Sequence, residues 1–193
     1  MIKAIIFDLN GVFIQSPNLS DRFQEKFGIL AEDFLPVLKE IMAKVRKPDA
    51  GSSFACWQPY LENWGVNLTE KEFFDFWFLA EKEVKELTEL AEEIKQKGIK
   101  IFILSNNFKE RAEYYSKNFD FLKILDKIYY SWQTGFVKPD PRAFQNILSE
   151  NNLNPNECIY FDNSEQNVEV AKSLGIEAHL FEDINSIRKV FKN

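Results

Sequence analysis

The chain has little cysteine, histidine and glycine, and it contains no long apolar run. Its 193 residues include two cysteines, one histidine and seven glycines. Two cysteines as far apart as Cys56 and Cys158 exclude a disulfide framework and a zinc knuckle. The single histidine, His179, is expected to be structural, which leaves no histidine base. No apolar stretch reaches the length of a membrane span and the N-terminus lacks a signal-peptide pattern, so we expect a cytoplasmic protein without a membrane partner.

Acidic residues outnumber basic ones. Lys and Arg total 24 against 30 Asp and Glu, which gives a net charge of −6. The basic residues are scattered and not clustered, so we expect no nucleic-acid partner. A hydrophobic fraction of 45% is ordinary for a soluble globular protein. The length suits one domain, or a core with a small insert, and leaves monomer and homodimer both open.

What the sequence does contain, from about residue 84 onward, is an alternation of strands and helices. Strands are predicted at 100–104, 124–131, 157–161 and 177–181, and helices at 83–97, 109–117, 141–150, 165–174 and 184–191. This order predicts an α/β fold with a doubly wound parallel sheet. The apolar run at residues 2–7 has no other partner and is expected to join the same sheet.

Residues 16–83 have helical periodicity and no convincing strand. Their pattern predicts four short helices, which form a small inserted bundle and not a second α/β unit. We therefore expect an α/β core at 1–15 and 84–193 and a helical cap at 16–83, above the carboxyl end of the first strand. Pro36 is expected in the first turn of its helix. The pair Thr69 and Glu72 indicates a capped helix start.

Two features of this insertion have a structural and a functional interpretation. The aromatic residues at helical spacing are expected to pack between the helices, with one or two of them able to line a pocket. They are Phe54, Trp57, Tyr60 and Trp64. Arg46 and Lys47 precede a loop and are expected to be a solvated pair.

Small polar and charged residues follow three of the apolar runs. Asp8, Ser105 and Asp162 each come at the end of a predicted strand, and Lys138 comes just before a helix start. The carboxyl ends of parallel strands share one sheet edge, where open α/β sheets bind their ligands. These four residues therefore predict a phosphate and metal site.

The residue types suit phosphoryl transfer. A carboxylate such as Asp8 can attack phosphorus, and Gly11 permits a backbone path close to a ligand. Ser105 and the amide of Asn106 can donate to phosphate oxygens. Lys138 can neutralise their charge, and Asp162 is a second anion for a cation that prefers oxygen.

The four segments resemble the signature motifs of the haloacid dehalogenase (HAD) superfamily of hydrolases, most of which are Mg²⁺-dependent phosphatases. They are Ile5–Val12, Ile101–Asn107, Gly135–Pro139 and Cys158–Ser164. The resemblance implies a nucleophile at Asp8, a phosphoryl group held by Ser105, Asn106, Lys138 and Gly11, and Mg²⁺ held by Asp8, the carbonyl of Asn10, Asp162 and Asn163. It also implies a Rossmann-like core with a helical cap of the first subfamily, and a small phosphorylated substrate.

Two asparagines depart from the family pattern. Asn10 stands where family phosphatases carry the Asp that acts as general acid and base, and its loss costs on the order of 10²–10⁴-fold in rate. Asn163 puts a neutral group in place of an acidic metal ligand. Three interpretations stay open: a slow or specialised phosphatase, a phosphatase with a substitute acid, or a retired member that binds a phosphorylated ligand or partner without turnover.

Overall fold

The centre of the protein is a parallel five-stranded sheet. The computed structural model describes residues 1–191. The strands are β1 (Ala4–Phe7), β4 (Lys100–Ser105), β5 (Lys127–Tyr130), β6 (Cys158–Asp162) and β7 (Glu177–Leu180). Their order in the sheet is β5-β4-β1-β6-β7, and every neighbouring pair is parallel. The predicted α/β class and the place of the first strand in this sheet are confirmed.

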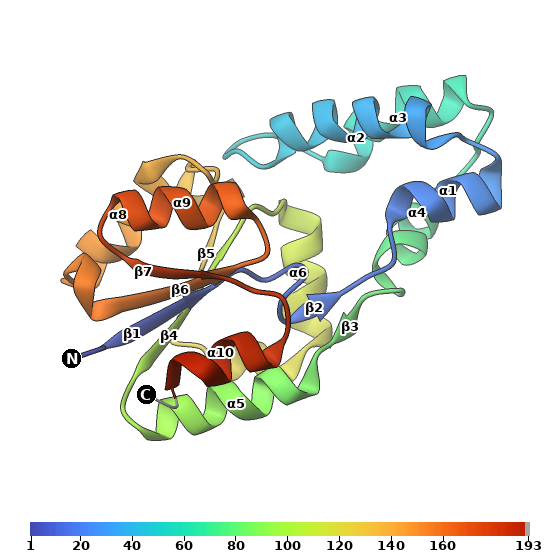
Figure 1. The fold of residues 1–193 in the computed structure, drawn as a ribbon. Helices are drawn as coiled ribbons and strands as arrows, with labels where there is room; N and C mark the ends of the chain where they lie inside the picture. The colour runs from blue at the N-terminus through green and yellow to red at the C-terminus, as the bar shows by residue number, and fades with distance from the viewer. Residues whose placement is uncertain (192–193) are drawn as a thin grey trace.

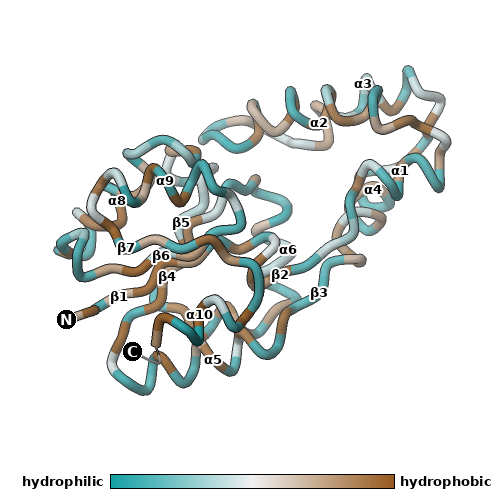
Figure 2. The backbone as a smooth tube through the Cα atoms, in the orientation of Figure 1, coloured by the Kyte–Doolittle hydropathy of each residue, from teal (hydrophilic) through white to brown (hydrophobic). Residues whose placement is uncertain are grey.

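Helices cover both faces of the sheet. One face packs against α5 (Lys85–Gln96), α6 (Lys109–Asn118) and α10 (Ile184–Phe191), and the other against α8 (Pro141–Glu150) and α9 (Glu165–Ser173). Figure 1 shows α8 and α9 above the strands and α5 and α10 below them. Alternate residues of β1 belong to the two apolar clusters: Ile5 and Phe7 face one layer, and Ala4 and Ile6 the other. The hydropathy colouring accordingly turns brown along the central strands (Figure 2).

The register brings the predicted polar residues to one edge. Phe7, the last residue of β1, pairs with Ile103 of β4 and Phe161 of β6. Asp8, Ser105 and Asp162 therefore all leave the sheet at its carboxyl edge. This edge is the ligand-binding side of an open α/β sheet.

Four helices that follow the first strand in the sequence and precede the rest of the core form a separate apolar cluster. They are α1 (Leu19–Phe27), α2 (Ala31–Val45), α3 (Ser53–Asn63) and α4 (Glu70–Phe78), and we call them the inserted helices. Figure 1 shows them to one side of the sheet. Trp57 is fully buried among Phe23, Phe34 and Phe73, which confirms packing as the main role of the aromatic stripe. The division of the chain at residues 15/16 and 83/84 stays a prediction.

Three local predictions differ from the structure. A two-stranded antiparallel ribbon, β2 (Ile14–Gln15) with β3 (Lys82–Glu83), joins the inserted helices to the core where no strand was predicted. Pro36 lies beyond the first turn of α2 and is exposed, so water can solvate the carbonyl oxygen that its missing N–H leaves free. The predicted strand at 124–131 is shorter, because the short 3₁₀ helix Asp120–Ile124 precedes β5 and the helical turn α7 (Ser131–Thr134) follows it.

Within residues 1–191, no helix combines the length and the apolar character that a membrane crossing requires.

Candidate active site

The carboxyl edge of the sheet contains a cavity of about 180 Å³. Seven of the predicted site residues line it, namely Asp8, Asn10, Ser105, Asn106, Lys138, Asp162 and Asn163. Four further residues complete the lining: Arg46, Arg111, Ser164 and Asn167. The segments that hold these side chains are far apart in the sequence, and the parallel sheet brings them together.

Lys138 links the two carboxylates of the site. Its Nζ lies 2.7 Å from Oδ1 of Asp8 and 2.7 Å from Oδ2 of Asp162, and all three side chains are buried. Burial raises the pKa of the Asp8 carboxyl and the negative charge of Asp162 adds to this, while the ammonium of Lys138 opposes it. The ammonium thus stabilises the ionised nucleophile that the sequence predicts.

Asn106 fixes the backbone of Lys138. Its Nδ2 donates to the carbonyl oxygen of Lys138, and its Oδ1 accepts from the N–H of Lys138, both at 2.8 Å. The side chain of Asn106 is therefore engaged, and only its backbone amide remains a candidate for the predicted phosphate contact. Fixing this backbone explains how a lysine in the loop before α8 reaches the ends of β1 and β6.

Ser105 is the clearest candidate for a phosphoryl ligand. It is the last residue of β4 and is 1% exposed. Its Oγ is buried and has no hydrogen-bond partner in the described part of the chain. A buried hydroxyl without a partner costs free energy, so this oxygen is well placed to bind a ligand oxygen that enters the cavity.

Asp162 accepts hydrogen bonds on both of its oxygens. Oδ1 accepts from the backbone N–H of Ser164 at 2.8 Å. Oδ2 accepts from Lys138, from the hydroxyl of Tyr160 and from Nδ2 of Asn167. These donors hold the Asp162 carboxylate against Lys138. Asp162 therefore positions the lysine.

The side chain of Asn10 points at a tyrosine. Its Nδ2 donates to the hydroxyl of Tyr115 at 2.6 Å. Burial raises the pKa of this hydroxyl well above its ordinary value, so Tyr115 holds the amide in place as a neutral phenol. The amide can bind a ligand, but it cannot exchange a proton as a carboxyl group does.

Gly11 makes room for Asn163. Its φ of +87° is one that residues with a side chain rarely adopt, and a Cβ at this position would lie 2.0 Å from Nδ2 of Asn163, so a substitution here would be strained and would displace the Asn163 side chain. The N–H of Gly11 donates to the carbonyl of Ile14. This amide is consequently engaged within the loop, and Gly11 does not line the cavity. The structure therefore differs from the prediction that Gly11 contacts the phosphate.

The donor set fits Mg²⁺. Nδ2 of Asn163 lies 3.5 Å from the carbonyl oxygen of Asn10, so Asn163 and Asn10 are neighbours beside Asp8 in the cavity. Among residues 1–191 no three His, Cys, Asp or Glu side chains cluster as a metal site, and a cation would depend on amide oxygens as well as carboxylate. Mg²⁺ is commonly bound by only one or two carboxylates together with waters and substrate phosphate.

Two arginines in the cavity were not predicted. Arg46 was expected to be solvated, but the loop after α2 returns to the core and the side chain enters the cavity. Arg111 lies on α6, the helix that follows Ser105, and pairs with Glu81. The position of Arg111 on that helix is a signal that sequence reasoning could have used. Arg46 has no such signal, because its position depends on how the inserted helices fold back.

Relatives of known activity include phosphatases. The chain is 25% identical over 193 residues to the phosphorylated carbohydrates phosphatase of Thermotoga maritima, covering 91% of this chain and 83% of that protein. It is 29% identical over 195 residues to mouse acyl-CoA dehydrogenase family member 10, covering 90% of this chain but only 17% of that protein. The chain therefore spans a small part of this much longer relative.

Solved structures share the fold. A HAD family enzyme from Bacteroides thetaiotaomicron superposes with a TM-score of 0.85 at 22% identity, covering 100% of this chain and 99% of that one. The same enzyme in complex with magnesium and inorganic phosphate gives a TM-score of 0.81 at 20% identity, covering 97% and 99%. The family model of the haloacid dehalogenase-like hydrolases matches residues 2–175. This chain belongs to the haloacid dehalogenase-like hydrolases.

Proposed function

We propose that the protein is a Mg²⁺-dependent phosphatase of a small phosphorylated molecule and acts through an aspartyl-phosphate on Asp8. The observation that supports this most directly is the meeting of three groups in one cavity: the Asp8 carboxylate, the Lys138 ammonium and the unpartnered Ser105 hydroxyl. Together they supply a nucleophile, a counter-charge and a hydrogen-bond donor for phosphoryl oxygens.

The reaction has two steps. In the first, a carboxylate oxygen of Asp8 bonds to phosphorus while the bond from phosphorus to the leaving oxygen breaks. In the second, water attacks the phosphorus, the bond to Asp8 breaks, and inorganic phosphate leaves. Lys138 and Ser105 hold the phosphoryl oxygens throughout, and Asp162 keeps Lys138 in place. When bound, Mg²⁺ would neutralise charge on those oxygens, with Asp8, the carbonyl of Asn10, Asp162 and Asn163 as its protein ligands.

Asn10 determines which substrates react quickly. The first step lacks a general acid, so it favours leaving groups that depart without a proton. The second step lacks a general base, so the phosphoenzyme breaks down slowly. With an activated donor, the intermediate on Asp8 accumulates. The cavity lining supports no substitute acid, because its carboxylates, Asp8 and Asp162, are both engaged by Lys138.

The alternative is a protein that binds a phosphorylated ligand without turnover. The amides at positions 10 and 163 favour it, since both replace groups that the reaction uses. Retention of Asp8, Ser105 and Lys138 in one cavity supports the phosphatase more strongly.

The test is an assay of the purified protein with Mg²⁺, using acetyl phosphate and p-nitrophenyl phosphate as activated substrates and an alkyl phosphate as a poor one. We expect turnover that EDTA removes and that Asp8→Asn abolishes. Asn10→Asp should raise the rate on the alkyl phosphate by about 10²–10⁴-fold. Acid quenching during acetyl phosphate turnover should trap phosphate on Asp8 of the wild type.

Asn156→Asp is the matched control, because Asn156 is exposed and lies in the short 3₁₀ helix Pro155–Glu157, before the start of β6 and outside the cavity lining. It should leave every rate unchanged. Turnover that survives Asp8→Asn contradicts the phosphatase mechanism. A wild type and an Asn10→Asp variant that are both inert favour the binding protein.

A further inference from the structure

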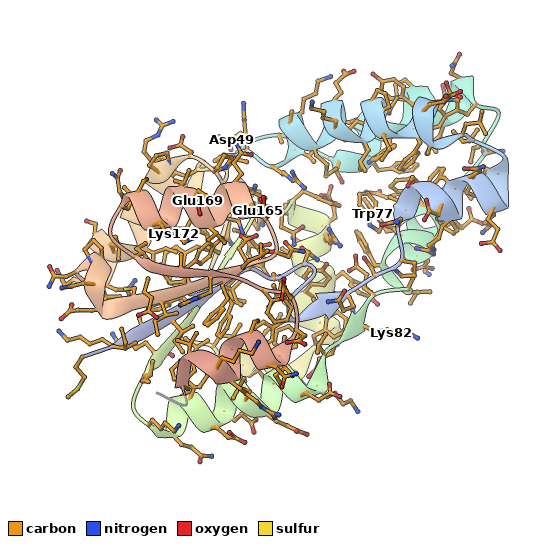
Figure 3. The ribbon with its side chains drawn as sticks, in the orientation of Figure 1. Asp49, Trp77, Lys82, Glu165, Glu169 and Lys172 are labelled. Atoms are coloured by element: carbon orange, nitrogen blue, oxygen red, sulfur yellow. The ribbon has the colours of Figure 1, made fainter. Side chains whose placement is uncertain are left out.

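Arg46 is the one cavity-lining residue that comes from the inserted helices, within the described part of the chain. The other ten lining residues belong to the core segments around β1, β4, β6 and the loop before α8. Arg46 directly follows α2, and Figure 1 shows the loop after α2 reaching back toward the core. Figure 3 labels Asp49 in the same returning loop. Arg46 therefore enters the cavity from the side of the inserted helices, opposite the residues at the sheet edge.

Two contacts hold this loop against the core. The backbone N–H of Ser53 donates to Oε1 of Glu110 at 2.8 Å. Pro48 lies against Gly135, where an added Cβ would be 3.6 Å from its Cγ. Arg46 lies between the end of α2 and these contacts in the sequence, so its entry into the cavity follows from a loop with fixed ends.

The guanidinium of Arg46 lacks a partner. It forms no ion pair and donates no hydrogen bond to residues 1–191, and its Nε is buried. Arg111, its positively charged neighbour, is paired with Glu81. Burial lowers the pKa of Arg46, the charge of Arg111 adds to this, and Asp8 opposes it. A partly buried guanidinium without an acceptor is costly, and an anionic ligand would remove that cost.

The transferred phosphoryl group already has ligands on the core side. Ser105 and Lys138 come from the sheet edge and the loop before α8, whereas Arg46 faces them from the inserted helices. From this arrangement we infer that Arg46 binds a second anionic group, a carboxylate or a phosphate, on the leaving part of the substrate. This inference rests on the proposed phosphatase function and names its substrate class.

The distance between the two anionic groups follows from the residues that line the cavity. Arg46, Ser105 and Lys138 all line the same cavity of about 180 Å³. A substrate that contacts all three at once carries its second anion only a few atoms from the phosphoryl group. The substrate is thus a short phosphorylated acid or a short bisphosphate, and Arg46 selects it because guanidinium groups bind carboxylate and phosphate in a bidentate geometry.

The test compares three probes that differ only in the distal group: ethyl phosphate, carboxymethyl phosphate and ethane-1,2-diol bisphosphate. Their dissociation constants are measured by calorimetry with Mg²⁺ in the Asp8→Asn background, where no phosphoryl transfer occurs. We expect carboxymethyl phosphate, ethane-1,2-diol bisphosphate or both, which carry a distal anion, to bind more tightly than ethyl phosphate. Arg46→Ala should reduce that preference by about 10- to 100-fold, and Arg46→Lys should restore part of it. The probe that loses more identifies the distal group.

Lys39→Ala is the control, because Lys39 is an exposed cation on the same helix that makes no ion pair with a described residue. It should leave the preference unchanged. Equal weakening of all three probes by Arg46→Ala would overturn the inference and assign Arg46 to the phosphoryl group. An unchanged preference would overturn it too. Absence of turnover in the wild-type assays contradicts the phosphatase proposal instead, since the binding measurement needs no turnover.

Discussion

Tyr160 shows how a single hydroxyl supports the charged centre of the site. It lies two residues before Asp162 on β6, so both side chains point to the same face. Its hydroxyl donates to Oδ2 of Asp162 and lies 3.2 Å from Nζ of Lys138. Burial raises the pKa of this hydroxyl well above its ordinary value, so it stays a donor at all physiological pH values.

Tyr160→Phe should lower the free energy of unfolding by about 1.5–3 kcal/mol, the usual worth of a hydrogen bond to a charged group. Urea unfolding measures the change. Tyr114→Phe is a matched control, since its hydroxyl donates to no residue within 1–191. A loss no larger than that of the control would show that Asp162 and Lys138 need no help from Tyr160.

At the level of single residues, the sequence motifs predicted which side chains meet in the cavity. They did not predict the neighbouring residues that orient those side chains. Asp8, Ser105, Lys138 and Asp162 could be placed from the sequence because each stands beside a strand end or a helix start. Tyr115 could not be placed, since an aromatic residue in a helix usually indicates core packing and nothing in the sequence points it at Asn10.

The start of α4 is an element whose boundary the sequence did predict. Thr69 accepts from the N–H of Glu72, and Glu72 accepts from the N–H of Thr69, which makes a reciprocal capping box. The Thr69 hydroxyl also donates to Oε2 of Glu72 at 2.6 Å, and this hydrogen bond, together with the one from the N–H of Thr69, lowers the pKa of Glu72. Because the folded pKa is depressed, this stabilisation is present above the unfolded pKa and is lost as the pH falls through the folded one.

Thr69→Ala should lower the melting temperature by about 2–4 °C at pH 7, with a smaller difference at an acidic pH low enough to protonate Glu72, whose pKa is depressed. Differential scanning calorimetry at both pH values measures this. Glu70→Gln, at the next position of the same helix, leaves the box intact and serves as the control. An effect of Thr69→Ala that is independent of pH would mean that Glu72 takes no part.

Helices with strong local sequence signals were predicted better than strands that form only because they pair with a distant segment. The bounds of α8 and α10 match their predictions, and α8 begins with the capping residue Asp140 followed by Pro141. The strands β2 and β3 have two residues each, too few for any periodicity. They exist because they pair with one another, and a sequence pattern cannot show a pairing across the whole insertion.

On the scale of the whole molecule, one buried ion pair joins the inserted segment to the core. Glu81 precedes β3 and Arg111 belongs to α6; Oε1 of Glu81 accepts from Nε and Nη2 of Arg111. Arg111 also lies over the ring of Trp77, and Trp77 and Phe78 pack on Phe108. This junction places the inserted helices beside the carboxyl edge of the sheet.

Glu81→Gln should lower the free energy of unfolding by about 3 kcal/mol, because it leaves the Arg111 guanidinium buried without its counter-charge. Urea unfolding followed by the fluorescence of the four tryptophans measures the change, and Trp77 among them belongs to the junction. Glu86→Gln removes an exposed charge from the first turn of α5 and is the control. If the two variants are equally stable, the pair does not hold the junction.

The β2–β3 ribbon has a consequence for how the chain is assembled. Gln15 lies opposite Lys82, so the two ends of the inserted segment lie side by side. For the core, the insertion is therefore equivalent to a surface loop, and the entropy cost of closing such a loop grows only slowly with its length. New helices can therefore be accommodated at this point, or existing ones exchanged, while the strands of the sheet and the residues at its carboxyl edge keep their register.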